Sequence, residues 1–160
     1  MVSPVTIEQD IKVLERVPTL AVLGRDALRI LAIGAETRYV HSGEVLFSIG
    51  DTSDAGYLIQ KGSFTLQESA AASATPPVVV HSGTLLGEFA LLAETARPMT
   101  AIAAEPSTVL RIPRSLFLKM LEGFPDAAGR LRDYIAMRAN RTADQIQKIS
   151  AALDPHGRRR

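Results

Sequence analysis

The chain has 160 residues, enough for one domain with a substantial core, and its 46% hydrophobic and 22% charged residues are ordinary for a soluble globular protein. The absence of cysteine excludes disulfides, thiolate catalysis and thiolate-bound zinc. The net charge of +1 combines an acidic excess up to residue 129 with a basic excess over 130–160. This basic excess favours a solvated helix face with a frayed end over a tail that meets nucleic acid, an acidic partner or an anionic membrane. The start of the chain lacks the features of a signal peptide, and no stretch is apolar enough to span a bilayer. We therefore expect a cytoplasmic protein without a transmembrane segment.

Apolar residues at helical spacing predict two helices near the N-terminus. The first covers 7–17 and is ended by Pro18, and the second covers 24–33 and is closed by Gly34. We expect residues 1–35 to form an N-terminal helical segment.

From residue 36 the pattern changes to short runs of β-favouring residues, separated by Gly, Asp, Ser or Pro. Many short, evenly spaced strands indicate a sandwich or a partly closed barrel, which we place at 36–113. Residues 40–46 resemble residues 80–86, as two equivalent turns of a two-layered β-roll would. The segment 68–77, rich in Ala, Ser and Pro, predicts a flexible hairpin loop. The expected strands are Thr37–Val40, Val45–Ile49, Gly56–Gln60, Ser63–Gln67, Pro77–His81, Ala101–Ala103 and Thr108–Ile112.

Residues 114–160 are expected to form C-terminal helices with a basic tail. A short apolar stripe over 116–121 is broken at Phe124-Pro125, and a long helix follows from Asp126 to about Leu153. Its second half extends past the reach of a β-roll, which favours a homodimer through helix–helix contact over a frayed single helix. The apolar stripe of this helix is Leu131, Ile135, Ala139, Thr142, Ile146, Ile149 and Leu153.

Residues 87–100 carry the chemistry that the sequence indicates. Gly87 and Glu88 open a short apolar helical turn, and Arg97 follows ten residues after Gly87. Backbone N–H groups at a helix start attract a phosphate, an arginine can close on it, and a carboxylate accepts hydrogen bonds from a sugar hydroxyl. The alternatives are an Arg97 paired with Glu88 or Glu94 at the surface, and a Glu88 that serves the helix dipole.

This segment resembles the phosphate-binding cassette of cyclic nucleotide-binding domains, the domains of catabolite activator-type regulators, protein kinase A regulatory subunits and cyclic nucleotide-gated channels. We call residues 86–100 the cassette. A second signature lies upstream, and the resemblance extends from about Leu20 to Arg138. It implies a mainly β fold with flanking helices, a double-stranded β-helix (a jelly-roll-like β-roll) of about eight strands in one domain. The upstream signature is Gly43-Glu44-Val45-Leu46-Phe47, then Gly50-Asp51, Asp54, Tyr57-Leu58-Ile59 and Gly62.

The resemblance also implies a role for individual residues. Arg97 would bind a cyclic phosphate, Glu88 the ribose 2′-hydroxyl, and the N–H groups of Phe89 and Ala90 the phosphate, while the Phe89 ring is expected to be buried. A helix after the β-roll would cover the base, with Tyr134, Leu131, Arg130 and Arg138 as candidates. The full set of expected ligand-binding residues is Leu86, Gly87, Glu88, Phe89, Ala90, Arg97, Pro98, Met99, Thr100 and Tyr134.

Two residues depart from the family pattern. Pro98 stands where the family has a residue with a free N–H, and Met99 stands where a small residue meets the purine. A hydrogen bond to a charged group contributes about 1.5–3 kcal/mol, so the loss at Pro98 predicts weaker binding.

No Ser/His/Asp order, metal-ligand cluster or phosphate loop indicates an enzyme, and no metal or cofactor is expected. The sequence predicts a non-catalytic cAMP or cGMP sensor whose ligand shifts the C-terminal helix. The sensor would act on an effector protein of unknown identity. The alternative is a degenerate fold that acts as a dimerisation or protein-interaction module. Direct DNA binding is not expected, because no helix-turn-helix follows Arg138.

Overall fold

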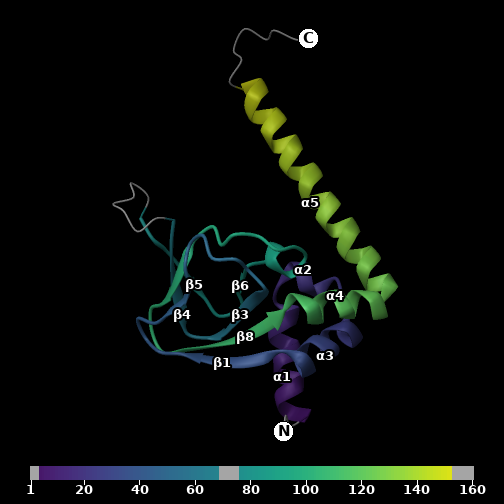
Figure 1. The fold of residues 1–160 in the computed structure, drawn as a ribbon. Helices are drawn as coiled ribbons and strands as arrows, with labels where there is room; N and C mark the ends of the chain where they lie inside the picture. The colour runs from purple at the N-terminus through teal and green to yellow at the C-terminus, as the bar shows by residue number, and fades with distance from the viewer. Residues whose placement is uncertain (1–3, 69–75, 153–160) are drawn as a thin grey trace.

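The computed structural model describes residues 4–68 and 76–152, with side chains from 6 to 68 and from 76 to 141. Helices precede and follow eight strands in the described chain (Figure 1). The helices are α1 (Pro4–Glu15), α2 (Pro18–Ala21), α3 (Arg25–Gly34), the 3₁₀ turn η1 (Phe89–Leu91), α4 (Arg114–Gly123) and α5 (Pro125–Ala152). The strands are β1 (Glu36–Val40), β2 (Val45–Phe47), β3 (Ala55–Lys61), β4 (Ser63–Gln67), β5 (Val78–His81), β6 (Leu85–Leu86), β7 (Thr100–Ala103) and β8 (Ser107–Pro113).

Two antiparallel four-stranded sheets form the body of the protein. One has the order β1-β8-β3-β6 and the other the order β2-β7-β4-β5. Consecutive strands therefore often lie in different sheets, and the chain winds around a shared interior. The expected β-roll of eight strands is confirmed.

The sequence located seven of the eight strands, with ends that differ by at most two residues. Strand β6 was missed, because two residues are too short to show an alternating pattern. The repeated segments do form equivalent turns. Gly43 and Gly83 have φ values of 84° and 91°, and each turn closes by a backbone bond to His41 or His81. Most of the expected loop at 68–77 lies outside the described residues.

The N-terminal helices differ from expectation at Pro18. Helix α1 ends at Glu15, and Pro18 begins α2 rather than ending a helix, because the first helical position needs no N–H donor. Helix α3 includes Gly34, which lies so close to Leu116 of α4 that a Cβ there would meet its side chain at 2.7 Å. This close approach packs α3 against α4.

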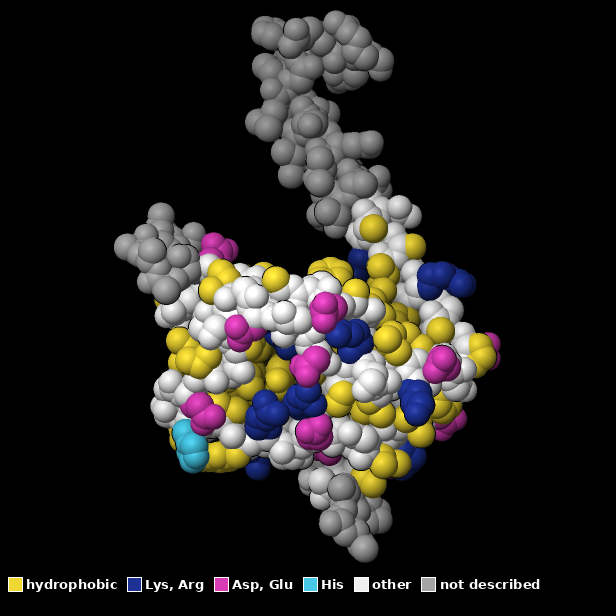
Figure 2. Space-filling model, in the orientation of Figure 1, with side chains coloured by type: hydrophobic (Ala, Val, Ile, Leu, Met, Phe, Trp, Pro, Cys, Tyr) yellow, Lys and Arg dark blue, Asp and Glu magenta, His cyan; other side chains and the backbone are white. Residues whose placement is uncertain are grey.

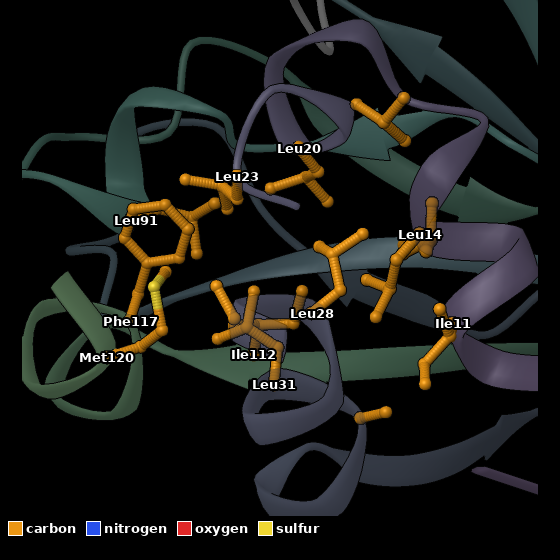
Figure 3. Close-up of a cluster of buried hydrophobic side chains, with 14 of the residues drawn as sticks. Ile11, Leu14, Leu20, Leu23, Leu28, Leu31, Leu91, Ile112, Phe117 and Met120 are labelled. Carbon is orange, nitrogen blue, oxygen red and sulfur yellow. The ribbon is translucent and has the colours of Figure 1, made fainter. Parts of the chain in front are cut away.

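A hydrophobic cluster joins the helices to the β-roll (Figure 3). Leu14, Leu28 and Leu31 from the N-terminal helices pack in it with Leu91 of η1 and Phe117 of α4. Because η1 shares this cluster with α4, a shift of the cassette would displace the side chains that pack it against the helices after the roll.

Helix α5 begins at Pro125 and extends away from the body (Figure 1). Hydrophobic side chains gather where α5 leaves the body (Figure 2). The part of the apolar stripe expected to form a dimer, from Thr142 onward, lies outside the residues whose side chains are described. Among the described residues, no helix has the length and apolar character needed to cross a membrane.

Candidate functional site

The backbone of Arg97 is held by the loop that joins β2 to β3. The Arg97 N–H donates to the carbonyl of Asp51 at 2.8 Å, and the Arg97 carbonyl accepts from Gly50 N–H at 2.8 Å. An antiparallel bridge between Thr52 and Ala96 continues this pairing. Asp51 itself caps its turn, since its carboxylate accepts from Ser48 N–H at 3.0 Å. The two family signatures therefore meet in space and fix where the Arg97 side chain starts.

The Arg97 guanidinium is buried, with only 4% of the residue exposed. One terminal nitrogen, Nη2, donates to the carbonyl of Ala55 at 2.7 Å, whereas Nη1 is buried without a hydrogen-bond partner. Burial lowers the pKa of Arg97, an effect that Tyr57, Asp54 and Asp51 oppose. None of the described carboxylates forms an ion pair with it. A buried, unpaired cation with a free donor is costly unless an anion completes it.

Two aromatic rings position this cation. The Arg97 Cζ lies 4.3 Å from the centroid of Phe47 and 5.5 Å from the centroid of Tyr57. Stacking on ring faces holds the planar guanidinium without neutralising its charge. The rings lie on β2 and β3, so both sheets contribute to the placement of Arg97.

Gly87 gives the cassette its shape. Its φ is 82°, and a Cβ there would lie 2.4 Å from Arg97 Nη1. The residue therefore has to be glycine both for its backbone conformation and for the approach of the arginine. The turn η1 follows directly, and Ala90 N–H donates to the Gly87 carbonyl at 3.0 Å.

A cavity of about 390 Å³ lies over this arrangement, within the range of small-molecule sites. Figure 2 shows one face of the body, where basic and acidic side chains are interspersed with hydrophobic ones. Met99 does not line the cavity. The walls of the cavity are Gly87, Glu88, Phe89, Ala90, Thr95, Ala96, Arg97 and Pro98.

Glu88 does not pair with Arg97, which was one alternative that the sequence left open. One oxygen, Oε1, accepts from Arg138 Nη1 of α5 at 2.8 Å, and the other accepts a short hydrogen bond from the Thr19 hydroxyl of α2. Its side chain makes no capping bond at the start of η1. A carboxylate oxygen can accept more than one hydrogen bond, so a sugar hydroxyl could still reach it.

The expectation of a buried Phe89 ring is wrong, because Phe89 is 67% exposed. The 3₁₀ turn instead buries Ala90 and Leu91 and turns Phe89 outward. Leu86 packs in the core of the roll, and the Thr100 hydroxyl accepts from Ile49 N–H at 2.8 Å. The cassette residues that line the cavity are thus Gly87 to Ala90 and Thr95 to Pro98, while Leu86 and Thr100 support the surrounding structure.

Two of the residues expected to cover the base, Arg130 and Leu131, make other contacts. Arg130 donates through Nε to the carbonyl of Val22 at 2.7 Å and through Nη2 to that of Leu23 at 2.8 Å, and Leu131 is buried in the core. Tyr134 is half-buried, and the Arg138 guanidinium lies 5.7 Å from its ring centroid. The first turns of α5 are therefore anchored to the N-terminal helices.

A second, apolar cavity of about 220 Å³ lies between the cassette and α5. It shares Glu88 and Phe89 with the first cavity, so these two residues stand between the two spaces. Its remaining walls are Thr19, Leu91, Leu92, Phe117, Leu131, Ile135, Arg138 and Ala139.

Sequence reasoning missed one residue that ties the site together. Arg114, the first residue of α4, donates through Nη1 to the carbonyls of Ser53 and Ala90, both at 3.1 Å. It links the end of η1 to α4, and no spacing pattern marks such side chain-to-carbonyl contacts. The described residues contain no group of three or more His, Asp or Glu placed to hold a metal ion.

The chain thus has an eight-stranded β-roll with a cavity lined by a buried arginine. The model of the cyclic nucleotide-binding domain matches residues 37–124, more than half of the chain. The chain therefore belongs to the cyclic nucleotide-binding domain family.

Solved structures with similar folds support this assignment. A cyclic nucleotide-binding-like protein from Brucella abortus is 38% identical, covers 71% of this chain and 97% of its own, and has a TM-score of 0.64. The N-terminal domain of a transcriptional regulator from Streptomyces coelicolor is 25% identical over 84% of this chain and 94% of its own, with a TM-score of 0.77.

Curated relatives are much longer proteins. A lysophospholipase of Neurospora crassa is 31% identical over 69% of this chain but only 7% of its own length. An uncharacterized NTE family protein of Mycobacterium bovis is 26% identical over 91% of this chain and 28% of its own. The chain thus spans less than a third of these relatives.

Proposed function

We propose that this domain is a non-catalytic sensor that binds a cyclic nucleotide, cAMP or cGMP, in the cavity over Gly87 and Arg97. The observation that carries the proposal is the buried Arg97 Nη1 with no partner, next to a glycine that lets it reach the cavity. A cyclic phosphate would supply the missing negative charge and two acceptor oxygens. The N–H groups at the start of η1 would add to this attraction.

The proposed regulation acts through Glu88. The ribose would share or take this carboxylate, which now holds Arg138 of α5 and Thr19 of α2. A ligand that competes for Glu88 would bind the arrangement with α5 released better than the one described, and so would shift α5. The relatives that contain this segment as a small part of a longer chain support a regulatory rather than an enzymatic role. A cyclic nucleotide ligand also fits the cytoplasmic location expected from the sequence.

The experiment is calorimetric titration with cAMP and with cGMP. Arg97→Ala and Glu88→Ala are expected to lose binding while keeping the fold, judged by far-UV circular dichroism. Arg29→Ala is the control, because Arg29 is an exposed arginine that pairs with Glu8 far from the cassette. Unchanged affinity in Arg97→Ala would overturn the site assignment.

A second candidate is a protein-interaction module without ligand, acting as a homodimer or on an effector protein. The observation in its favour is Pro98, which lines the cavity where an N–H donor would serve a phosphate. Flat titrations with both nucleotides, together with a dimer by light scattering, would favour this candidate.

A further inference from the structure

We infer that Phe89 is the platform on which the nucleotide base stacks. This inference rests on the proposed function and extends it from the phosphate to the base. Phe89 follows Glu88 directly, lines the cavity over Arg97, and is 67% exposed. Single exposed apolar side chains are common on protein surfaces, but Phe89 lies directly beside the candidate phosphate site.

The position is specific, because the phosphate end of a nucleotide is fixed by charge. With the phosphate at Gly87 and Arg97 and the ribose at Glu88, the remaining part of the ligand is a planar base. Phe89 stands between the anion cavity and the apolar cavity beside α5, where a base leaving the ribose would meet it.

The other rings near the site already have partners. Phe47 and Tyr57 stack on the guanidinium of Arg97, and Tyr134 lies against that of Arg138. Phe89 lines both cavities, and its 67% exposure leaves the ring accessible to a base. Stacking of a base on an aromatic ring is sequence-tolerant, so it would add affinity without choosing between adenine and guanine.

The inference also explains how the domain can bind despite Pro98. The N–H lost at Pro98 weakens the hold on the phosphate, whereas a base stacked on Phe89 adds affinity at the opposite end of the ligand. Base-bearing ligands should therefore bind much more tightly than the bare sugar phosphate.

The test compares cAMP with ribose 3′,5′-cyclic phosphate, which has the same anion and sugar but no base. Phe89→Ala should weaken cAMP binding roughly five- to a hundredfold and leave binding of the base-free probe unchanged. Phe89→Tyr, which keeps the ring, should retain wild-type affinity for cAMP. Ile33→Ala is the control, since Ile33 is 54% exposed on α3 and lines neither cavity. Calorimetry measures the tighter ligand, and ³¹P NMR titration measures the weaker one.

The outcomes distinguish a failure of the base platform from a failure of the anion site. An unchanged cAMP affinity in Phe89→Ala, or an equal loss for both probes, would overturn the role of Phe89 and leave the anion site standing. A wild-type chain that binds neither probe would overturn the proposed function, and the base platform with it.

Discussion

Arg138 on α5 lies 2.8 Å from the Glu88 carboxylate at the start of the cassette, and Thr19 on α2 donates to the other oxygen of the same group. One carboxylate thus joins the cassette to a helix before the β-roll and a helix after it. The Arg138 side chain is 45% exposed and that of Glu88 25%, so the pair is partly screened by solvent. A contact of this modest strength can hold a helix and still be broken by a ligand.

Removing Arg138 should loosen the start of α5. In Arg138→Ala we expect faster amide hydrogen exchange in α5 and α2, with a change in global stability of no more than about 1 kcal/mol. Hydrogen–deuterium exchange followed by mass spectrometry measures the effect. Arg132→Ala is the control on the same helix, because Arg132 is 79% exposed and only reaches Asp133 at 3.7 Å. Equal protection of α5 in wild type and Arg138→Ala would contradict this role.

Replacing Gly87 should remove ligand binding, for a reason that can be separated from backbone strain. Gly87→Ala places a Cβ against Arg97 Nη1 and also forces an L-residue to φ 82°. Gly43→Ala has the same backbone problem at φ 84°, but its Cβ meets nothing within 4 Å. Both variants should lose about 1–2 kcal/mol of stability in thermal unfolding, and only Gly87→Ala should lose nucleotide binding by calorimetry. Loss of binding in both would show that strain alone explains it.

Restoring an N–H at position 98 should strengthen binding of the cyclic phosphate. Pro98→Ala supplies a backbone donor at the wall of the anion cavity, and a hydrogen bond to a charged group contributes about 1.5–3 kcal/mol. We expect at least a tenfold gain in cAMP affinity by calorimetry. Pro106→Ala, an exposed proline between β7 and β8, is the control for the general effect of removing a proline. If both variants bind cAMP as wild type does, the lost donor at Pro98 is not what limits affinity.

Asp10 should make stability depend on pH in the acidic range. Its burial raises the pKa of the carboxyl, although the hydrogen bond from Gln60 at 2.6 Å opposes this. The folded state therefore holds the proton more tightly than the unfolded chain, and the fold loses stability as pH rises through the unfolded and then the folded pKa. Asp10→Asn keeps an acceptor for Gln60, so it should be more stable than wild type at pH 7, with a smaller gap near pH 3. Denaturant unfolding at both pH values checks this, with Asp133→Asn as an exposed control. A gap that grows toward pH 3 would contradict the sign.

The sequence brought Gly87 and Arg97 into one candidate site because the geometry that joins them is local. Gly87 must be glycine and Arg97 must follow at a fixed distance, and both requirements leave a readable spacing. Contacts between remote side chains leave no such trace. The pairing of Glu88 with Arg138 joins residues 50 positions apart, and that of Arg97 with the Ala55 carbonyl joins residues 42 apart.

The orientation of Phe89 was also beyond the sequence, for a different reason. An apolar residue between Glu88 and Ala90 fits a buried face of an α-helical turn, but the tighter 3₁₀ turn rotates it outward.

Arg130 donates to the carbonyls of Val22 and Leu23, and these hydrogen bonds fix the start of α5 as the point about which the helix would pivot. Helix α5 continues to Ala152, which at 1.5 Å per residue is about 33 Å beyond that point. A tilt of about 10° at this point would move the far end of the helix by about 6 Å. The length of α5 thus converts a small movement at the cassette into a much larger movement at the end of the helix.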